Sequence, residues 1–597
     1  MGTETEQFFS PSPHPLKAHS RVLLRLGLTC LVLTAAYYFA VQFQETYDAY
    51  HSSGILLNEQ LAREICPQPT PLIPSAARDL WEEIERDIGA EEFKVKAIEW
   101  LGGAINVATE TFDDMGPIGE DSRWENRALF HKYLEKTFPL VHSILNLEKV
   151  NTYGLVYTWH GSDPSLKPIL LMAHYDVVPV NPETVSEWEH PPYSGFYDGT
   201  NIWGRGSLDD KSALIGTISA IEILLSKGFK PTRTVLVQFG FDEEGGGSRG
   251  AGKIAEHLLE IYGEDSFSFV IDEGGGFSQS YGTAFATPGV AEKGSTNVNI
   301  EVSTPGGHSS VPPDHTSIGI LSALLVHMEN TPFESHIDRT TPTYGLFLCL
   351  AAHARNLSED LRGKILDSVK SDEALRQVEK ILFENKLYKS LIGTTQAIDI
   401  VHGGIKSNAL PEQAMAIVNH RIAVTSSVSQ THAHDATLFL PLAEHFNLTY
   451  DAFGQTLGPS STCPSAGTLR LTSGGGLNPA PVTPIMWGQA APYEFLSGTI
   501  KGVYRAHRSL TEGAENVLNK QLDIIVAPGM PTGNTDTKYY WKLTPHIFRY
   551  NHHNQGSDKN ALSGAHTVNE HVTAESLLET INFFVTLILN ADESRVI

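Results

Sequence analysis

Three short apolar segments alternate with segments of helical periodicity in the first half of the chain. The apolar runs cover residues 168–173, 234–241 and 267–271, and the periodic segments cover residues 211–227 and 250–262. Near-continuous apolar runs of this length are typical of strands that are buried on both faces. Strands that alternate with helices indicate a sheet with helices on both sides. The predicted fold class is therefore α/β, with a mostly parallel sheet flanked by helices.

The pattern changes near residue 293. From there it predicts a strand at 296–302, a helix at 317–328, charged helices within 356–390, strands at 414–424 and 448–453, and a closing helix at 574–589. Residues 456–480 are rich in Gly, Ser, Thr and Pro, which favours a loop. We predict an inserted α+β lid or dimerisation domain at 293–490, between two parts of a catalytic domain at 86–292 and 491–597.

An apolar segment at residues 21–43 precedes the globular part of the chain. Its length matches the roughly 20 residues that a membrane-spanning helix needs. We predict a transmembrane signal anchor here, followed by a proline-containing juxtamembrane linker at 44–85. A cleaved signal peptide and a buried helix of the globular part are the two alternatives.

The charges that flank this segment are asymmetric. Lys17, Arg21 and Arg25 lie before it or near its start, whereas acidic residues follow it. The positive-inside rule then makes residues 1–20 a cytosolic tail and places the body of the chain in a lumen.

Composition limits the partners of the chain. The 597 residues exceed what one ordinary core holds, which favours two globular domains. A formal charge of −26 repels phosphate groups and argues against a nucleic-acid partner.

The cysteines and sequons bear on the compartment. The four cysteines include no CxxC pair, so a cysteine zinc site is not expected. Cys30 lies in the apolar segment, and Cys66, Cys349 and Cys463 allow at most one disulfide, whose pairing the sequence leaves open. Glycosylation sequons begin at Asn356 and Asn447 and agree with a lumenal body.

Candidate metal ligands follow the predicted strands. His174-x-Asp176 follows the first apolar run, and Asp209 lies in a glycine-containing segment before the next helix. A ligating imidazole usually donates its other N–H to a carboxylate, which Asp176 provides. Taken alone, these motifs also fit a structural histidine and a helix cap.

Further carboxylates and a histidine complete the set. Asp242-Glu243-Glu244 follows the second run, Asp272 follows the third, and His566 lies near the C-terminus. Adjacent carboxylates repel one another unless cations share the site, although a solvated acidic loop is the alternative. Open α/β sheets bind ligands at the carboxyl ends of their strands, where all three motifs fall. Imidazole and carboxylate ligands suit zinc, without excluding cobalt or manganese.

Together these motifs resemble the full motif set of the di-zinc exopeptidase family, which includes aminoacylase, carnosinase and glutamate-releasing carboxypeptidases. The matching motifs are His174-x-Asp176, Gly204-Arg205-Gly206-x-x-Asp209-Asp210-Lys211, Asp242-Glu243-Glu244, Asp272 and His566-x-x-Asn569-Glu570. The likeness spans about residues 85–597. The predicted anchor and residues 306–313 are most similar to fungal vacuolar Gly-Xaa carboxypeptidases of this family.

The resemblance implies two zinc ions per subunit. By this likeness His174 and Asp272 hold one ion, Glu244 and His566 hold the other, and Asp209 bridges them. Two ions about 3.5–4 Å apart activate a water molecule for hydrolysis.

The resemblance also implies catalytic roles outside the ligand set. Asp176 orients His174, and Glu243 is the general base that accepts a proton from the water. His308, in the inserted domain, stabilises the oxyanion, and in relatives this histidine can come from the partner subunit of a dimer.

Three residues are candidates for binding substrate by the same likeness. Asn408 resembles a lid asparagine, although a turn residue is the alternative. Lys538 stands where many relatives have arginine, and a lysine pairs with a carboxylate without the bidentate geometry of arginine. Arg421 is an alternative to Lys538, or a structural residue.

The resemblance therefore implies a membrane-anchored, lumenal di-zinc metallocarboxypeptidase that acts on short peptides, with a vacuolar location and a homodimer as a further option. An N-acyl-amino-acid amidohydrolase with the same site is the alternative within enzymes. A binding protein without catalysis is the alternative outside them, although no expected ligand is missing from the sequence.

Overall fold

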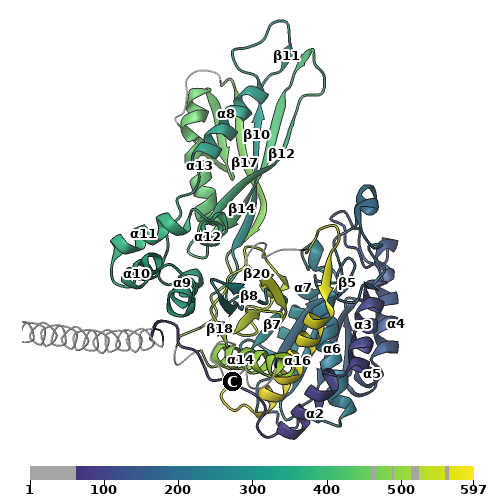
Figure 1. Ribbon diagram of the computed structural model, residues 1–597. Coiled ribbons are helices and arrows are strands. Elements are labelled where there is room, and N and C mark those ends of the chain that lie inside the picture. Colours follow the sequence, from purple (N-terminus) through teal and green to yellow (C-terminus); the bar gives the residue numbers. More distant parts are fainter. Residues whose placement is uncertain (1–61, 63, 459–464, 487–489, 513–522, 558–563) are drawn as a thin grey trace, which may run out of the picture. The chain divides into compact units, whose positions relative to one another are not determined.

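The computed structural model describes residues 62 and 64–597, except 459–464, 487–489, 513–522 and 558–563. Residues Cys66–Ile597 form one unit, which contains all the elements named below (Figure 1). The segments predicted as cytosolic tail and membrane anchor lie outside the described residues. Among the residues that the structure does describe, no helix combines the length and the hydrophobicity needed to cross a membrane.

A six-stranded sheet forms the centre of the predicted catalytic domain. Its strand order is β1 (Asn146–Val150), β2 (Gly154–Trp159), β6 (Val235–Gly240), β3 (Ile169–His174), β7 (Val270–Asp272) and β19 (Ile547–Arg549). The last four strands run parallel to one another, whereas β2 pairs antiparallel with both of its neighbours, β1 and β6.

The sheet is thus mixed, and the prediction of a mostly parallel sheet holds only for its part from β6 to β19. The physical reason lies in the connection between β1 and β2. Only residues 151–153 separate them, and so short a connection forms a hairpin, because a parallel crossover needs a dozen or more residues.

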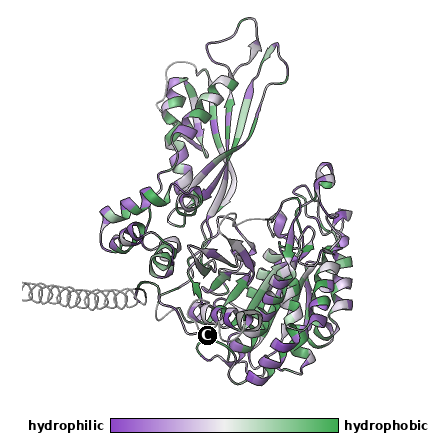
Figure 2. Ribbon diagram, viewed as in Figure 1, coloured by the Kyte–Doolittle hydropathy of each residue, from purple (hydrophilic) through white to green (hydrophobic). Residues whose placement is uncertain are grey.

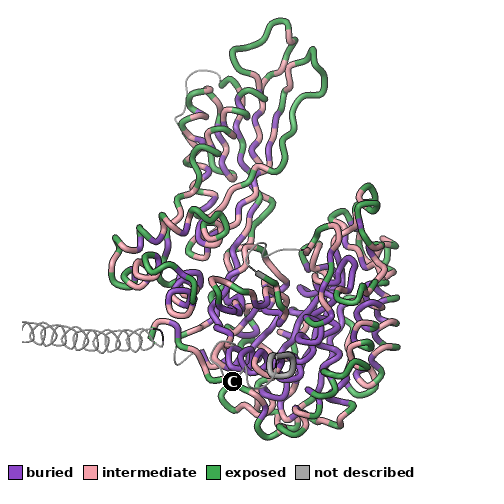
Figure 3. The backbone as a smooth tube through the Cα atoms, viewed as in Figure 1, coloured by how far each residue is buried: buried purple, intermediate pink, exposed green. Residues whose placement is uncertain are grey.

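Helices cover both faces of this sheet. On one face the core contains residues of α3 (Glu91–Ile105), α6 (Lys211–Ser226) and α16 (Ala574–Glu593). On the other face α7 (Ala251–Tyr262) packs through Ile254 and Leu258. Figure 2 shows hydrophobic residues concentrated on the strands between these helices. Figure 3 shows that the same region is buried. Helix α6 is buried all round, as expected for a helix that is apolar on every side.

Smaller elements surround the central sheet. They comprise the helices α2 (Arg78–Ile88), α4 (Asn126–Thr137), α5 (Pro139–Ile144) and α14 (Ala491–Glu512), a sheet of β18 (Ile524–Val526), β9 (Thr283–Ala286), β8 (Phe277–Ser280) and β20 (Asn554–Ser557), and a sheet of β21 (His571–Thr573), β5 (Asn201–Trp203) and β4 (Phe196–Tyr197). Helix α2 begins within the range predicted as linker.

The inserted part of the chain contains a second sheet (Figure 1), which has six strands. Its order is β12 (Thr395–Gly403), β14 (Gln413–Ile422), β10 (Gly294–Ser303), β17 (Gly467–Leu477), β15 (Leu448–Ala452) and β16 (Gln455–Leu457). Helices α8 (Ser317–Asn330) and α13 (Val428–His445) pack on one face, against alternate residues such as Val298, Ile300 and Val302. Two short strands, β11 (Gly307–His308) and β13 (Ala409–Leu410), pair beyond the end of the sheet.

Strand β17 lies where the sequence predicted a loop at 456–480. That prediction was wrong, because the Gly, Ser and Thr content of the segment obscured a short alternation. Leu469 and Leu471 are fully buried, and the residues between and beside them are not. Strands β10 and β15 flank β17 on its two edges, so tertiary pairing outweighs the weak strand propensity of glycine.

A group of four helices precedes β12: α9 (Pro342–His353), α10 (Glu359–Ser368), α11 (Asp372–Leu382) and α12 (Lys386–Ile392). We call it the helical appendage. It has its own apolar cluster, in which Phe347 and Val378 are fully buried. A disulfide between Cys66 and Cys349 joins this cluster to the start of the described chain. It is one of the pairings that the sequence left open. Disulfides persist in oxidising compartments such as the secretory lumen.

Candidate metal centre

The order of the central strands brings three candidate motifs together. Strand β3 lies between β6 and β7, and all three are parallel. His174 is the last residue of β3 and Asp272 the last of β7, while Glu243 and Glu244 follow β6 in a short 3₁₀ turn. Because parallel strands end at one edge of the sheet, this edge is the expected ligand site.

Two loops outside the sheet supply the remaining candidates, and Glu570 binds them together. Its carboxylate is fully buried and accepts hydrogen bonds from Leu208 N (2.9 Å) and Asp209 N (3.2 Å). The other carboxylate oxygen pairs with Arg205 Nη1. Glu570 therefore fixes the loop that carries Asp209 against the loop that carries His566.

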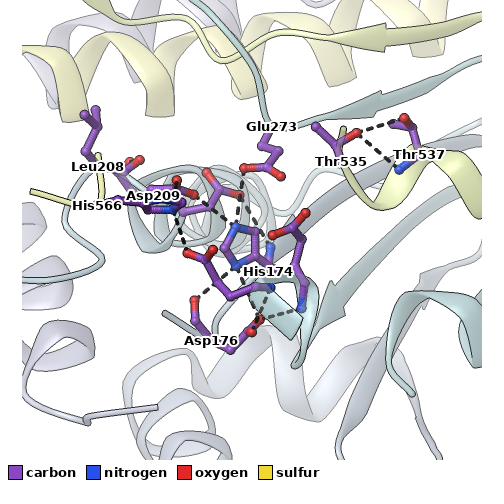
Figure 4. Close-up of polar contacts among 12 residues, drawn as sticks. His174, Asp176, Leu208, Asp209, Glu273, Thr535, Thr537 and His566 are labelled. Carbon is purple, nitrogen blue, oxygen red and sulfur yellow. Dashed lines mark hydrogen bonds and ion pairs between the residues drawn. The ribbon is translucent and has the colours of Figure 1, made fainter. Parts of the chain in front are cut away.

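Asp209 lies between two imidazoles (Figure 4). Its Oδ1 is 3.1 Å from His174 Nε2, and its Oδ2 is 3.2 Å from His566 Nε2. His566 Nε2 is also 3.1 Å from Glu244 Oε1. The two oxygens of one carboxylate thus face two different imidazoles, which is the geometry expected of a ligand shared by two ions.

Asp176 connects His174 to the turn that carries the two glutamates. Its Oδ1 lies 3.4 Å from His174 Nδ1, and its two oxygens accept hydrogen bonds from Glu243 N (3.0 Å) and Glu244 N (3.1 Å). The Asp176 side chain is completely buried. Asp176 therefore orients the imidazole through its carboxylate and through its backbone carbonyl, which lies 3.1 Å from His174 Nδ1, while the carboxylate also holds the backbone of both glutamates.

Glu273 approaches His174 although the sequence pointed to its neighbour Asp272. Its Oε2 lies 3.3 Å from His174 Nε2, and it forms a potential metal-ligating group with His174 and Asp210. Asp272 is buried, and its Oδ2 has no hydrogen-bond partner among the described residues. Two acidic residues at a strand end point in different directions, and sequence alone does not say which one faces the site.

Two further carboxylates complete the surroundings of the cluster and were missed by the sequence reasoning as site residues. Asp210 is buried, with Oδ2 at 3.4 Å from His174 N. Asp536 is 2% exposed, and neither of its carboxylate oxygens has a hydrogen-bond partner within the described part of the chain. Asp210 could have been predicted from its position beside the candidate ligand Asp209. Asp536 lies far from the predicted ligands in sequence, so no local pattern pointed to it.

The electrostatics of the cluster call for cations. Contacts of 3.1–3.4 Å join four carboxylates to the two imidazoles. Burial raises the pKa of Glu273 well above its usual range, and hydrogen bonds to Asp209 and Glu244 raise the pKa of His566 to about 10. Carboxylates held this close to one another favour a bound cation that compensates their charge. The donor set, all oxygen and imidazole nitrogen, fits zinc.

Glu243 shares its turn with Glu244 but differs from it in its contacts. Burial raises its pKa well above the usual range, and the nearby charge of Glu273 raises it further. Its backbone is fixed by Asp176, while its carboxylate takes part in none of the contacts between carboxylates and imidazoles that define the cluster. A carboxylate beside a metal cluster that is not itself a ligand is suited to act as a base.

The substrate-binding candidates are distributed over different regions. Arg421, on β14, donates from Nη1 to Asn534 Oδ1 at 3.2 Å, which places it beside the loop that leads to Asp536. Lys538 follows Asp536 in a short 3₁₀ helix, with its ammonium 5.2 Å from the centre of the Tyr539 ring. Asn408 is exposed near the β11–β13 pair.

His308 does not lie in this cluster. It is exposed on β11, and its Nδ1 is 2.7 Å from Ser310 Oγ. Strand β10, which is 10 residues long, separates the start of the inserted domain from β11. At about 3.3 Å per residue this strand spans roughly 33 Å, so His308 lies far from the base of the inserted sheet.

The sequence model of "Peptidase family M20/M25/M40" matches residues 170–590. Carboxypeptidase S of Saccharomyces cerevisiae is 39% identical over 534 residues, which cover 88% of this chain and 89% of that protein. The mouse N-fatty-acyl-amino acid synthase/hydrolase PM20D1 is 32% identical over 509 residues, which cover 84% of this chain and 89% of that protein.

Solved structures share the fold. The di-peptidase Dug1p of Saccharomyces cerevisiae gives a TM-score of 0.56 at 14% identity, over 86% of this chain and 99% of that chain. Human carnosine dipeptidase 1 gives a TM-score of 0.53 at 15% identity, over 87% of this chain and 100% of that chain. The α/β fold with an inserted β-rich domain is thus common to these proteins.

Proposed function

The chain belongs to peptidase family M20/M25/M40, and from this premise we propose that it is a di-zinc metallocarboxypeptidase that removes the last residue of short peptides, of the Gly-Xaa type. The observation that carries the proposal is the placement of Asp209 between His174 and His566. The similarity to a carboxypeptidase over most of both chains supports the direction of cleavage.

His174 would hold one zinc ion together with Glu273 or Asp272, His566 and Glu244 would hold the other, and Asp209 would bridge the pair. Ions at these positions would supply Lewis-acid activation of a water molecule and of the scissile carbonyl. The buried Asp176 keeps the His174 ring in the orientation that directs Nε2 to the centre.

Glu243 is the proposed general base. It accepts a proton from the attacking water while the water oxygen bonds to the carbonyl carbon. It then delivers this proton to the nitrogen of the leaving amino acid as the carbon–nitrogen bond breaks. Burial supports this role, because it raises the pKa of Glu243 above its usual range and so makes its carboxylate a stronger base.

The choice between Glu273 and Asp272 as the ligand of the His174 site is open to a direct test. We expect Glu273→Gln to lower the metal content from two ions per chain to about one, because the Oε2 that faces His174 is replaced or turned away. Asp272→Asn is the matched neighbour and should retain both ions. Metal analysis of the purified proteins by mass spectrometry measures this, and the reverse result would return the role to Asp272.

An N-acyl-amino-acid amidohydrolase is the second candidate. It is supported by the similarity to the mouse N-fatty-acyl-amino acid synthase/hydrolase, which extends over most of this chain. The same centre would cleave an amide in which an acyl chain replaces the peptide. Turnover of blocked Gly-Leu compared with N-oleoyl-leucine distinguishes the two substrate classes.

The proposed location is the vacuolar lumen, with residues 21–43 as a signal anchor and residues 1–20 in the cytosol. The Cys66–Cys349 disulfide supports an oxidising compartment on the body's side. The similarity to carboxypeptidase S directs the choice of vacuole.

A homodimer formed through the inserted domain, at residues 293–490, is part of the proposal. Strand β12 is an edge strand, and its outer half is exposed, including the apolar Val401. Ile405, in the following loop, is fully exposed. Exposed apolar edge strands favour pairing with another chain, and a second copy would bring a His308 that the chain's own centre lacks.

The experiment that tests the function is turnover of a blocked Gly-Leu dipeptide by the full chain in detergent. We expect chelator treatment to abolish release of leucine and added zinc to restore it. Zinc-loaded protein that cleaves N-oleoyl-leucine instead would support the second candidate. Zinc-loaded protein that cleaves neither substrate would contradict a hydrolytic function.

A further inference from the structure

Arg127 is a buried cation that the proposed mechanism does not use. It lies on α4, and its side chain is completely buried. Within the described part of the chain no carboxylate forms an ion pair with it, and its guanidinium carbon lies 4.8 Å from the centre of the Trp124 ring. Burying a charge costs free energy unless hydrogen bonds and opposite charge nearby compensate it. Arg127 is therefore expected to act on an anion in its surroundings.

The hydrogen bonds of Arg127 lead toward the metal centre. Its Nη2 donates to Thr111 Oγ1 at 2.6 Å and to Phe241 O at 3.5 Å, and its Nη1 donates to Asn126 Oδ1 at 2.8 Å. Burial lowers the pKa of Arg127, and the charge of Asp176 opposes this more than that of any other neighbour. The anion that Arg127 faces is thus Asp176, with the side chain of Thr111 between the two charges.

Thr111 connects the guanidinium to the carboxylate. Its hydroxyl oxygen accepts from Arg127, and its hydroxyl proton is donated to the Asp176 side chain. Thr111 is 5% exposed, and its N–H donates to Val177 O at 3.0 Å, which fixes it beside the chain that leaves β3. Hydrogen bonds in a chain polarise one another, so a hydroxyl that accepts from a cation is a stronger donor to an anion.

Asp176 extends these contacts to the residues of the centre. Figure 4 shows it on the side of His174 that is away from Glu273. Its Oδ1 lies 3.4 Å from His174 Nδ1, and its two oxygens accept from Glu243 N and Glu244 N. His174 and Glu244 are proposed ligands of different ions. A rotation of this one carboxylate would therefore displace ligands of both.

We propose that Arg127 and Thr111 are positioning residues for the metal centre, which hold Asp176 in one orientation and so strengthen the binding of the zinc ions. The inference rests on the proposed function, since it takes zinc as the metal of the centre. The chain of contacts runs from the Arg127 guanidinium through the Thr111 hydroxyl and the Asp176 carboxylate to the His174 imidazole. We call this chain the buried relay.

The test compares two replacements of Thr111. Thr111→Val keeps the branched shape but removes the hydroxyl, whereas Thr111→Ser keeps the hydroxyl but removes a methyl group. Zinc affinity of the full-length protein in detergent is measured by competition with a chelator of known affinity. We expect Thr111→Val to bind zinc about 10-fold more weakly, the lower end of what loss of an outer hydrogen-bond partner costs, and Thr111→Ser to match the wild type. A role in packing alone predicts the reverse order, and that order or equal affinities would overturn the proposal.

Thr109→Val is the matched control. Thr109 lies two residues earlier in the same segment and is completely buried, and its hydroxyl donates to the backbone carbonyl of Tyr175 rather than to Asp176. Its replacement should lower the temperature of thermal unfolding and leave zinc affinity unchanged. If Thr109→Val weakens zinc binding as much as Thr111→Val does, any defect in this segment has the same effect and the proposal fails.

A double-mutant cycle tests the connection to Arg127. Arg127→Met replaces the buried charge with an apolar side chain, and such replacements are often tolerated by the fold. It should weaken zinc binding about 10-fold alone, and no further when it is combined with Thr111→Val, because both interrupt one chain of contacts. Losses that multiply to about 100-fold would show that the two residues act independently, which contradicts the buried relay. The two Thr111 variants keep the test decisive if the Arg127 variant does not fold.

The buried relay and the proposed function fail by different measurements. Zinc affinities in the expected order, in a protein that hydrolyses neither substrate class, would support the positioning role and contradict the proposed function. Wild-type turnover of the blocked dipeptide together with equal zinc affinities of Thr111→Val and Thr111→Ser would support the function and overturn the positioning role.

Discussion

Replacing Glu243 with glutamine should lower kcat for a blocked Gly-Leu dipeptide by about 10²–10⁴-fold, with two zinc ions still bound. This is the range that general acid–base catalysis contributes. Glutamine has the same shape but neither accepts nor carries the proton. The backbone of residue 243 is held by Asp176 through its N–H, so the turn keeps its position. Steady-state kinetics and metal analysis of the same preparation measure the two quantities together.

Glu244→Gln is the matched control, because it changes the adjacent residue in the same turn. Glu244 contacts His566 at 3.1 Å and is a proposed ligand, so this variant should lose metal as well as activity. The contrast separates a base from a ligand. Undiminished kcat in Glu243→Gln would reject the base assignment, and loss of zinc in that variant would make it a ligand instead.

The fold was predictable where one local pattern decided it. The sequence predicted helix α6 and the buried strands β3 and β6 to within one or two residues. Each is buried along almost its whole length, so its apolar run marks its bounds directly. Strand β17 was missed because pairing with β10 and β15, which is not a local property, makes a strand of a glycine-rich segment. The antiparallel edge of the central sheet was missed for the same reason, because it depends on which strands β2 pairs with.

The candidate site shows the same division. Sequence motifs identified His174, Asp209 and His566, and the structure places them at 3.1–3.2 Å contacts. By the resemblance they pointed to Asp272 rather than to Glu273, and which of the two faces the site depends on how the chain leaves β7. The buried Asp536 was out of reach, since only the fold brings that segment to the cluster.

A further expected result concerns two subunits at once. A protein carrying Glu243→Gln and a protein carrying His308→Ala should each be nearly inactive, the second by about 10²–10³-fold, as for loss of one oxyanion donor. In a heterodimer, the His308→Ala subunit keeps its own Glu243 and receives His308 from the partner. One of the two sites is then complete, so heterodimers should recover about half of the wild-type activity, because a twofold dimer has two equivalent sites.

The physical basis of this prediction is the position of His308. It is exposed on β11, which lies beyond the end of β10, and β10 itself is roughly 33 Å long. Coexpression of the two full-length chains with different affinity tags, followed by tandem purification, isolates the heterodimer. Pairing Glu243→Gln with Glu244→Gln is the control: both subunits retain His308, each site keeps its own defect, and activity should stay lost. If the heterodimer of Glu243→Gln and His308→Ala is as inactive as that control, His308 does not act across a dimer, and the exposed edge of β12 must serve another purpose.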